Sequence, residues 1–385
     1  MLLVRMKELQ EIIPFVIQAD HQDPSIIVAT VLQAEESSYC KPGTRILLTK
    51  TDQTIKAICE DYIDQKIIDQ VKQLVQINAS LQVYRYHVDC PHKLNKTSSQ
   101  GGTTILLEPL NSRSTRAQFD FIAECYSENQ SGAIATVFTV EGAIPAQIAS
   151  RLFLKMDGSV ANQIGDHFLT NLIFQDTVKI LAAGQTRTRS YPFIDGYVQA
   201  LIEVITPPIQ LYIFGITPYT SPITLLAKQL GWTVVIIEHP SREIKLNHFP
   251  EADHILKVDT QDLPKQIQLS SYSAAVVMTG NFEQDLAIVK FLWSSAIGYL
   301  GIPGTKARAQ QLIQGLQGGG TLTTQQLNRL HGPIGLDIGA ETPSEIALAI
   351  VSEIQAVVKH RTGSFLREQQ NSIHDSVPDL ISLIK

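Results

Sequence analysis

The sequence predicts an α/β protein in which a β-rich, duplicated α+β region precedes a Rossmann-like, doubly wound parallel sheet. Three observations lead to this prediction. Two similar sets of short apolar runs fill residues 1–207, apolar runs alternate with helical patterns from residue 208 onward, and the linker 206–209 contains two prolines. Strands that alternate with helices are typical of parallel sheets. We therefore expect an N-terminal region of residues 1–207, a C-terminal domain of residues 208–370 and a tail of residues 371–385.

The composition limits the classes of function. The chain has 385 residues, 44% of them apolar, and a formal charge of −6. A mildly acidic chain without a basic run is not typical of nucleic-acid-binding proteins. No apolar run reaches the roughly 18 residues of a membrane span and no leader peptide is apparent, so we expect a cytoplasmic protein. Its widely spaced cysteines form no metal-binding pattern and are expected to be reduced: Cys40, Cys59, Cys90 and Cys125.

The N-terminal region contains a diverged internal repeat, at about 25–110 and 130–205. Arg45 and Arg151 have the same spacing in the chain as Thr30 and Thr136, and each member of these pairs lies in a similar apolar segment. Each copy is expected to hold short alternating strands and one helix, near 60–77 and 166–184. Each copy also closes with an apolar run that ends in an acid. The two arginines either bind anions or pair with carboxylates, and the sequence leaves both alternatives open.

The C-terminal domain shows strands and helices in alternation. Apolar runs predict strands at 211–214, 233–237, 255–258, 274–278 and 298–300. A helix is expected through 225–230, and further helices are expected to begin near Phe282, Thr305 and Pro343. In a sheet of this kind, ligands bind at the carboxyl ends of the strands.

The turn after the first of these strands is an incomplete dinucleotide fingerprint. Gly215 is present, but Thr217 and Thr220 stand where two further glycines would let a pyrophosphate approach the backbone. Glu238, at the end of the second strand, is where an acid would contact a ribose, although acids at strand ends are also common for solvation. Binding of NAD or NADP through this loop is therefore an alternative rather than the leading prediction.

Two further turns of this domain carry polar groups. Asn281 is expected to cap a helix, with Glu283 and Asp285 in its first turn, either stabilising the helix dipole or projecting into a crevice. The tight loop from Gly301 to Gly304 leads to a helix with two cations, Lys306 and Arg308. A helix N-terminus with nearby cations suits an anion such as a phosphate, and a plain turn is the other interpretation.

The segment 329–350 has the most informative pattern in the chain. Thr342, Pro343 and Glu345 form the pattern of a capping box at a helix start. Asp337, Gly339 and Glu341 precede the cap, and a helix start alone does not require them. We interpret the two acids and this glycine as part of a binding site, with a well-capped helix after a tight loop as the alternative.

In the N-terminal region, Cys40 lies in a polar loop next to Lys41, which could lower the pKa of a thiol. A lone cysteine is more often inert than reactive. We include Cys40 and Arg45 among the candidate cofactor-binding residues. No Ser-His-Asp signature is present, and His331 is interpreted as a loop histidine.

The order of these motifs resembles the XdhC/CoxI family, the accessory proteins of molybdenum hydroxylases such as xanthine dehydrogenase. The resemblance covers most of residues 25–367 and rests on these segments: 29–31, 37–39, 42–45, 101–103, 108–110, 211–215, 230–234, 281–285, 329–343 and 363–367. It implies binding of molybdenum cofactor, help with its sulfuration and delivery to an apo-hydroxylase, without catalytic turnover of a metabolite. A cysteine desulfurase is a further implied partner, and a homodimer is plausible.

The chain departs from the family pattern at several positions. The family cysteines are absent from the segment 60–64 and from Gln100, and Thr217 and Gly280 replace a glycine and a histidine of the family. A diverged member that has lost cofactor handling is therefore a second hypothesis. If cofactor handling has been lost, the two alternative functions are a nucleotide-dependent oxidoreductase and a ligand-free scaffold.

Overall fold

The computed structural model describes residues 2–19, 25–34, 41–50, 55–58, 68–69, 71–73, 75, 82–86, 103–243, 248–317 and 329–368. The chain divides into two compact units, here called unit 1 (Met1–Pro207) and unit 2 (Pro208–Lys385). Each unit has its own buried apolar clusters, so each has an independent core.

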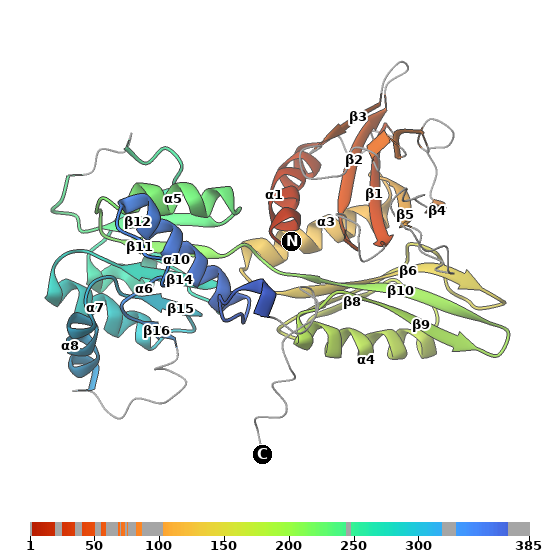
Figure 1. The fold of residues 1–385 in the computed structure, drawn as a ribbon. Coiled ribbons are helices and arrows are strands. Elements are labelled where there is room, and N and C mark those ends of the chain that lie inside the picture. Colours follow the sequence, from red (N-terminus) through yellow and green to blue (C-terminus); the bar gives the residue numbers. More distant parts are fainter. Residues whose placement is uncertain are drawn as a thin grey trace. The chain divides into compact units, whose positions relative to one another are not determined.

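Unit 1 contains two antiparallel sheets with the same connectivity (Figure 1). The first has the order β3-β2-β1-β5-β4, with β1 Ile26–Gln33, β2 Arg45–Lys50, β3 Ile55–Ile58, β4 Gln82–Tyr86 and β5 Thr103–Pro109. The second has the order β8-β7-β6-β10-β9, with β6 Gly132–Glu141, β7 Arg151–Lys155, β8 Val160–Asn162, β9 Arg187–Phe193 and β10 Gly196–Ile205. Each strand therefore has a counterpart in the other sheet, and Arg45 and Arg151 begin equivalent strands.

The described part of unit 1 also contains the helices α1 Leu2–Gln18, α3 Arg113–Ser127 and α4 His167–Ala183. Helix α4 agrees with the expected helix near 166–184. It begins where the Asp166 side chain accepts from the Leu169 N–H and ends at Gly184, which has a left-handed backbone. Helices α1 and α3 lie outside the predicted elements. They share one apolar cluster, in which Ile12 of α1 and Phe119 of α3 are fully buried.

Unit 2 is a six-stranded parallel sheet of order β13-β12-β11-β14-β15-β16. Its described residues form β11 Gln210–Phe214, α5 Thr220–Gln229, β12 Thr233–Glu238, β13 His254–Lys257, a 3-10 turn η3 Thr260–Asp262, α6 Leu263–Gln266, β14 Ser273–Val277, α7 Phe282–Trp293, β15 Tyr299–Gly301, α8 Lys306–Gln317, β16 Leu330–His331, α10 Pro343–Val358 and η4 Leu366–Glu368. This order and the antiparallel sheets of unit 1 confirm the predicted fold class. Strand β16 was not predicted, because two residues show no periodicity.

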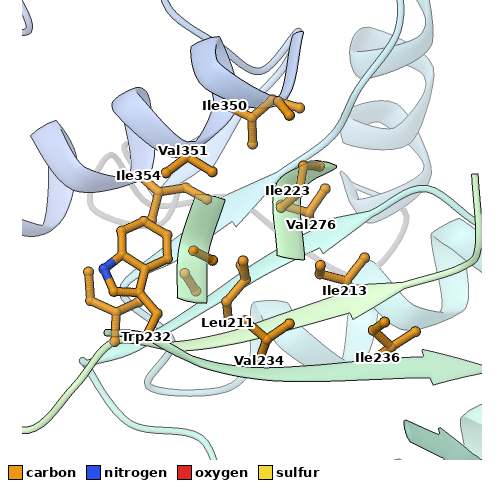
Figure 2. Close-up of a cluster of buried hydrophobic side chains, with 14 of the residues drawn as sticks. Leu211, Ile213, Ile223, Trp232, Val234, Ile236, Val276, Ile350, Val351 and Ile354 are labelled. Atoms are coloured by element: carbon orange, nitrogen blue, oxygen red, sulfur yellow. The ribbon is translucent and has the colours of Figure 1, made fainter. Parts of the chain in front are cut away.

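Helices cover both faces of the unit 2 sheet. Apolar residues of α5 and α10 pack on one face, and those of α6, α7 and α8 pack on the other (Figure 1). Figure 2 shows Trp232 against Ile354 of α10, with Leu211 and Ile213 of β11 in the same cluster. Full burial of one such side chain contributes about 1.5–3 kcal/mol, so this two-sided core fixes the strands that carry the edge loops.

Candidate functional site

The direction of the strand order reverses at β11, which pairs with β12 on one side and β14 on the other. In open α/β sheets the ligand crevice lies at the carboxyl edge at this point. Gly215 follows β11 with a φ of +96°, and a Cβ there would lie 2.6 Å from the Thr279 Cα. The loops after β11 and β14 therefore touch, and a glycine is required for this contact as well as for the backbone conformation.

The backbone N–H groups of the first loop are already bonded within the unit. Gly215 donates to Ile237 O at 2.8 Å, and Ile216 donates to the Glu238 carboxylate at 3.0 Å. Thr217 and Tyr219 donate to threonine hydroxyls of the loop, and Thr220 donates to Thr217 O. Pro218 has no N–H. A pyrophosphate at this loop would find no available backbone donor between residues 215 and 220, which argues against dinucleotide binding here.

Glu238 is 2% exposed and stabilises this loop rather than presenting a free acid. Its carboxylate accepts N–H groups from Ile216 and His239, and Arg242 Nη1 lies 3.2 Å from Oε2. Because these donors enclose the carboxylate, a ribose could not reach it in this conformation. The Arg242 side chain itself is 54% exposed.

Asp285 has the same relation to the loop after β14. It is 1% exposed, and its Oδ1 accepts from the N–H and the hydroxyl of Thr279 at 3.0 and 2.6 Å. Its Oδ2 lies 2.5 Å from Nη2 of Arg308, whose side chain is 31% exposed. Asp285 therefore lies beneath the surface and anchors an arginine that reaches it.

The other predicted residues of these two turns are also placed. Asn281 caps α7 by accepting from the Gln284 N–H, as expected, and Glu283 in the first turn is exposed. Gly301 is buried in β15, where a Cβ would lie 2.7 Å from Ile334. Gly304 is exposed with a φ of +118° just before α8. Gly301 is thus required by packing, whereas Gly304 lies next to the cations of α8.

Helix α10 begins as the sequence predicts. The Thr342 hydroxyl accepts from the Glu345 N–H, and the Glu345 carboxylate accepts from Thr342 N–H, which confirms the capping box. Hydrogen bonds from Thr342 and Glu341 lower the pKa of Glu345. Asp337, Gly339 and Glu341 are exposed. A role for these three in binding stays a prediction.

A polar cluster inside unit 2 was not predicted. The Tyr299 ring is fully buried and stacks on the His331 imidazole with centroids 4.5 Å apart. Its hydroxyl donates to Glu353 at 2.6 Å, and Glu353 also accepts from the Gly335 N–H and lies 3.5 Å from His331 Nδ1. The available signal was Glu353, an acid three residues after Ile350 in the apolar stripe of α10.

In unit 1, the two candidate arginines pair with acids of the opposite sheet. Arg45 of β2 makes two hydrogen bonds of 2.8 Å to Glu203 of β10, and Arg151 of β7 lies 2.5 Å from Glu108 of β5. Both arginines are 1% exposed. Pairing with carboxylates is therefore the alternative that the structure supports, and these two ion pairs join the two sheets.

The described side chains give little support for a metal site built from protein ligands. Cys40 lies outside the described residues. Burial raises the pKa of Cys125 to about 12, so this thiol is protonated at neutral pH. The described part of the chain holds no group of three or more His, Cys, Asp or Glu residues that could bind a metal ion. Among the same residues, no helix is long and apolar enough to cross a membrane.

The chain is similar to proteins linked by name to xanthine dehydrogenase. A model described as the XdhC Rossmann domain matches residues 211–354, and one described as the XdhC and CoxI family matches residues 125–192. A protein of Bacillus subtilis (strain 168), named as a probable subunit of xanthine dehydrogenase, is 24% identical over 329 residues, which cover 85% of this chain and 92% of that protein. The uncharacterised protein YqeB of Escherichia coli (strain K12) is 22% identical over 260 residues, which cover 64% of this chain and 47% of YqeB.

A solved structure shares the fold. The crystal structure of a xanthine dehydrogenase from Bacillus halodurans aligns with a TM-score of 0.67 and 20% identity, over 91% of this chain and 94% of that one. The two family models fall on both units, and the motifs at the carboxyl edge of the unit 2 sheet lie within the longer match. The chain therefore belongs to the XdhC/CoxI family.

Proposed function

We propose that this protein binds molybdenum cofactor and assists its sulfuration and insertion into a xanthine dehydrogenase-type molybdenum hydroxylase. In this role it delivers the cofactor to the apo-hydroxylase, with a cysteine desulfurase as a sulfur source, and does not itself turn over a metabolite. The family membership and the name of the Bacillus subtilis relative support the link to xanthine dehydrogenase. The cytoplasm, where an apo-hydroxylase would be assembled, is the compartment that this proposal requires.

The single observation that carries a binding role is the Arg308 guanidinium at the start of α8. The buried Asp285 carboxylate holds Nη2, while the side chain is 31% exposed at the carboxyl edge of the sheet. Lys306, in the same first turn, is exposed. A positioned guanidinium, a second cation and a helix N-terminus together suit the phosphate of a pterin cofactor.

The described residues fit the phosphate end of this cofactor better than its metal. They supply no cluster of metal-ligating side chains, so the pterin would have to carry its own metal. When bound, the cofactor supplies the redox chemistry of the hydroxylase. The contribution of this chain is to bind the phosphate through Arg308 and Lys306 and to keep Arg308 in place through Asp285.

Two other functions have less support. A nucleotide-dependent oxidoreductase requires donors for a pyrophosphate, but the N–H groups from Gly215 to Thr220 already have acceptors. A ligand-free scaffold does not require an anchored arginine together with a second exposed cation, Lys306, at one helix N-terminus. A homodimer is compatible with all three functions and forms part of the proposal only as one arrangement for delivery.

The test is to purify the protein from a host that makes molybdenum cofactor, denature it, oxidise the supernatant and measure pterin fluorescence. The expected result is one pterin per chain in the wild type and loss of this signal in Arg308→Gln. Arg242→Gln is the matched control, because Arg242 is also an exposed arginine held by a buried acid, Glu238. It should retain the pterin.

A double variant, Asp337→Ala with Glu341→Ala, tests the predicted part of the site in the loop before α10. Both side chains are exposed, so the fold should tolerate the change. Loss of pterin from this folded variant would extend the site to that loop. Folded wild-type protein that carries no pterin, from a host with demonstrable cofactor, would contradict the proposed function, and titration with NAD and NADP would follow.

A further inference from the structure

A serine, a histidine and an aspartate meet at the ends of two neighbouring strands of unit 2. His239 and Ser241 follow β12, and Asp259 follows β13, which pairs with β12. Ser241 Oγ lies 2.7 Å from His239 Nδ1, and His239 Nε2 lies 3.6 Å from Asp259 Oδ2. Strands β11 and β14 lie between β12 and β15 in the sheet, so this cluster is separate from the Arg308 site that follows β15.

The hydrogen bonds at His239 define the roles of its two ring nitrogens. The Ser241 N–H donates to Nδ1 at 3.2 Å, so Nδ1 carries a lone pair and the neutral ring carries its proton on Nε2. The Nε2–H group then faces the Asp259 carboxylate, and the Ser241 hydroxyl donates to Nδ1. In this arrangement a carboxylate orients an imidazole, and the imidazole can accept the proton of a serine nucleophile. The contact at 3.6 Å is loose, as such contacts often are before a substrate binds.

Main-chain hydrogen bonds hold these side chains in place. His239 O accepts from the Arg242 N–H at 3.1 Å, which closes the turn after β12. Asp259 Oδ1 accepts from the Gln261 N–H at 3.1 Å, so Oδ2 is the oxygen that remains for His239. A plain turn could be stabilised by the Ser241 N–H alone. It would require neither the hydroxyl at Nδ1 nor an acid from a second strand.

An arginine beside the serine can stabilise the charge that develops during ester hydrolysis. Arg242 follows Ser241 directly, and its side chain is 54% exposed. Glu238 Oε2 lies 3.2 Å from Nη1. A guanidinium has five N–H groups, so others can donate to an oxyanion. Ser241 is exposed, and a small substrate can therefore reach its hydroxyl.

We propose that Ser241, His239 and Asp259 form a nucleophilic site that hydrolyses small carboxylic esters, an activity that does not depend on the proposed cofactor role. The Ser241 oxygen bonds to the carbonyl carbon of the ester while its proton moves to His239 Nδ1. The bond between this carbon and the alcohol oxygen then breaks, and the leaving alcohol takes the proton from Nδ1. Water hydrolyses the acyl-serine by the same route, which releases the acid and restores the serine.

The test measures hydrolysis of para-nitrophenyl acetate by the full chain, together with labelling by a fluorophosphonate probe located by peptide mass spectrometry. The probe should label Ser241 in the wild type. Ser241→Ala and His239→Gln should each lower kcat/KM at least about tenfold, because a positioned general base contributes about 10²–10⁴-fold. Asp259→Asn should lower kcat and leave KM unchanged, because Asp259 orients the base without touching the ester.

Two control variants separate this site from the general reactivity of exposed side chains. Ser294→Ala removes another exposed hydroxyl and His254→Gln another exposed imidazole, and both should hydrolyse the ester as the wild type does. Urea denaturation checks that each variant is folded. Folded wild type whose Ser241 is not labelled, or hydrolysis by Ser241→Ala at the wild-type rate, would overturn the proposal.

Discussion

The buried ion pairs of unit 1 and the ion pairs at the edge of the unit 2 sheet use the same chemical groups in different environments. In unit 1 both partners of each pair are inaccessible to water. Arg45 and Arg151 are each 1% exposed, and the acids that they contact are exposed by no more than a few per cent. In unit 2 the acids are equally buried, but Arg308 is 31% and Arg242 is 54% exposed. Exposure of the arginine, and not the presence of the pair, thus separates a structural contact from a group that can meet a ligand.

This difference has an energetic consequence. A buried pair costs desolvation for both ions, so removal of one partner leaves a charge that water cannot reach. A pair with an exposed arginine is screened by water and salt, and the arginine can be solvated when its acid is lost. We therefore expect the mutational cost to follow the burial of the arginine.

The largest effect is expected from Glu203→Leu. This substitution leaves Arg45 buried without its carboxylate, and the free energy of unfolding should fall by about 3–5 kcal/mol, as measured by urea denaturation of the unit 1 transition. The double variant Arg45→Met with Glu203→Leu should recover most of this loss, because it removes both charges. Single and double variants of equal stability would show that the pair does not couple the two sheets.

A smaller effect is expected from Tyr299→Phe in unit 2. The substitution removes only the hydroxyl that donates to the Glu353 carboxylate at 2.6 Å. A hydrogen bond to a charged group is worth about 1.5–3 kcal/mol, so urea denaturation at neutral pH should show a loss of this size. Tyr212→Phe is the control, because its hydroxyl donates to an uncharged carbonyl, Gln268 O, and should cost less.

The same variant has a pH signature. Burial raises the pKa of Glu353. Hydrogen bonds from His331, Tyr299 and Gly335 lower this pKa by more than burial raises it, so the folded pKa lies below the ordinary 4.5. The stability from these contacts is therefore complete above about pH 4.5 and is lost as the pH falls through the folded pKa. The difference between wild type and Tyr299→Phe should shrink as the pH falls from neutral through this range. A constant difference would contradict a charged Glu353.

The comparison also separates what the sequence could predict from what it could not. The strands of unit 2 other than β16, the α7 cap at Asn281 and the capping box at Thr342 depend on residues close in the chain, and the local pattern was sufficient for them. The crossed pairing of Arg45 with Glu203 depends on how two sheets pack. Repetition indicated equivalent arginines, but it could not decide between an anion and a carboxylate as their partner.

The candidate site shows the same limit. Sequence reasoning placed Asp285 and Arg308 on separate turns of the carboxyl edge, as an acid for the crevice and a cation for a phosphate. It could not show that they pair, because the contact joins α7 to α8, two helices separated in the chain by a strand. Gly301 was a candidate for binding, but a Cβ there would collide with Ile334 and Tyr299, a constraint visible only in three dimensions.

A local contact should have an intermediate cost. Thr342→Ala removes the side-chain acceptor of the capping box at the start of α10, and a loss of about 1 kcal/mol is expected in the unit 2 unfolding transition. Thr342→Ser is the control that retains the hydroxyl, and it should be close to wild type. A cost above that of Tyr299→Phe would show that α10 depends more on its cap than on its buried face.

The smallest effect is expected from Arg242→Ala, which tests the ion pair whose arginine is the most exposed of the four compared. Its guanidinium lies 3.2 Å from Glu238, but the carboxylate retains hydrogen bonds from the Ile216 and His239 N–H groups. The loss should stay below about 1 kcal/mol and should decrease further in high salt, because an exposed charge is screened. Urea denaturation at low and high ionic strength measures both quantities. A salt-independent loss as large as that of Glu203→Leu would mean that burial of the acid alone sets the mutational cost, whatever the exposure of the arginine.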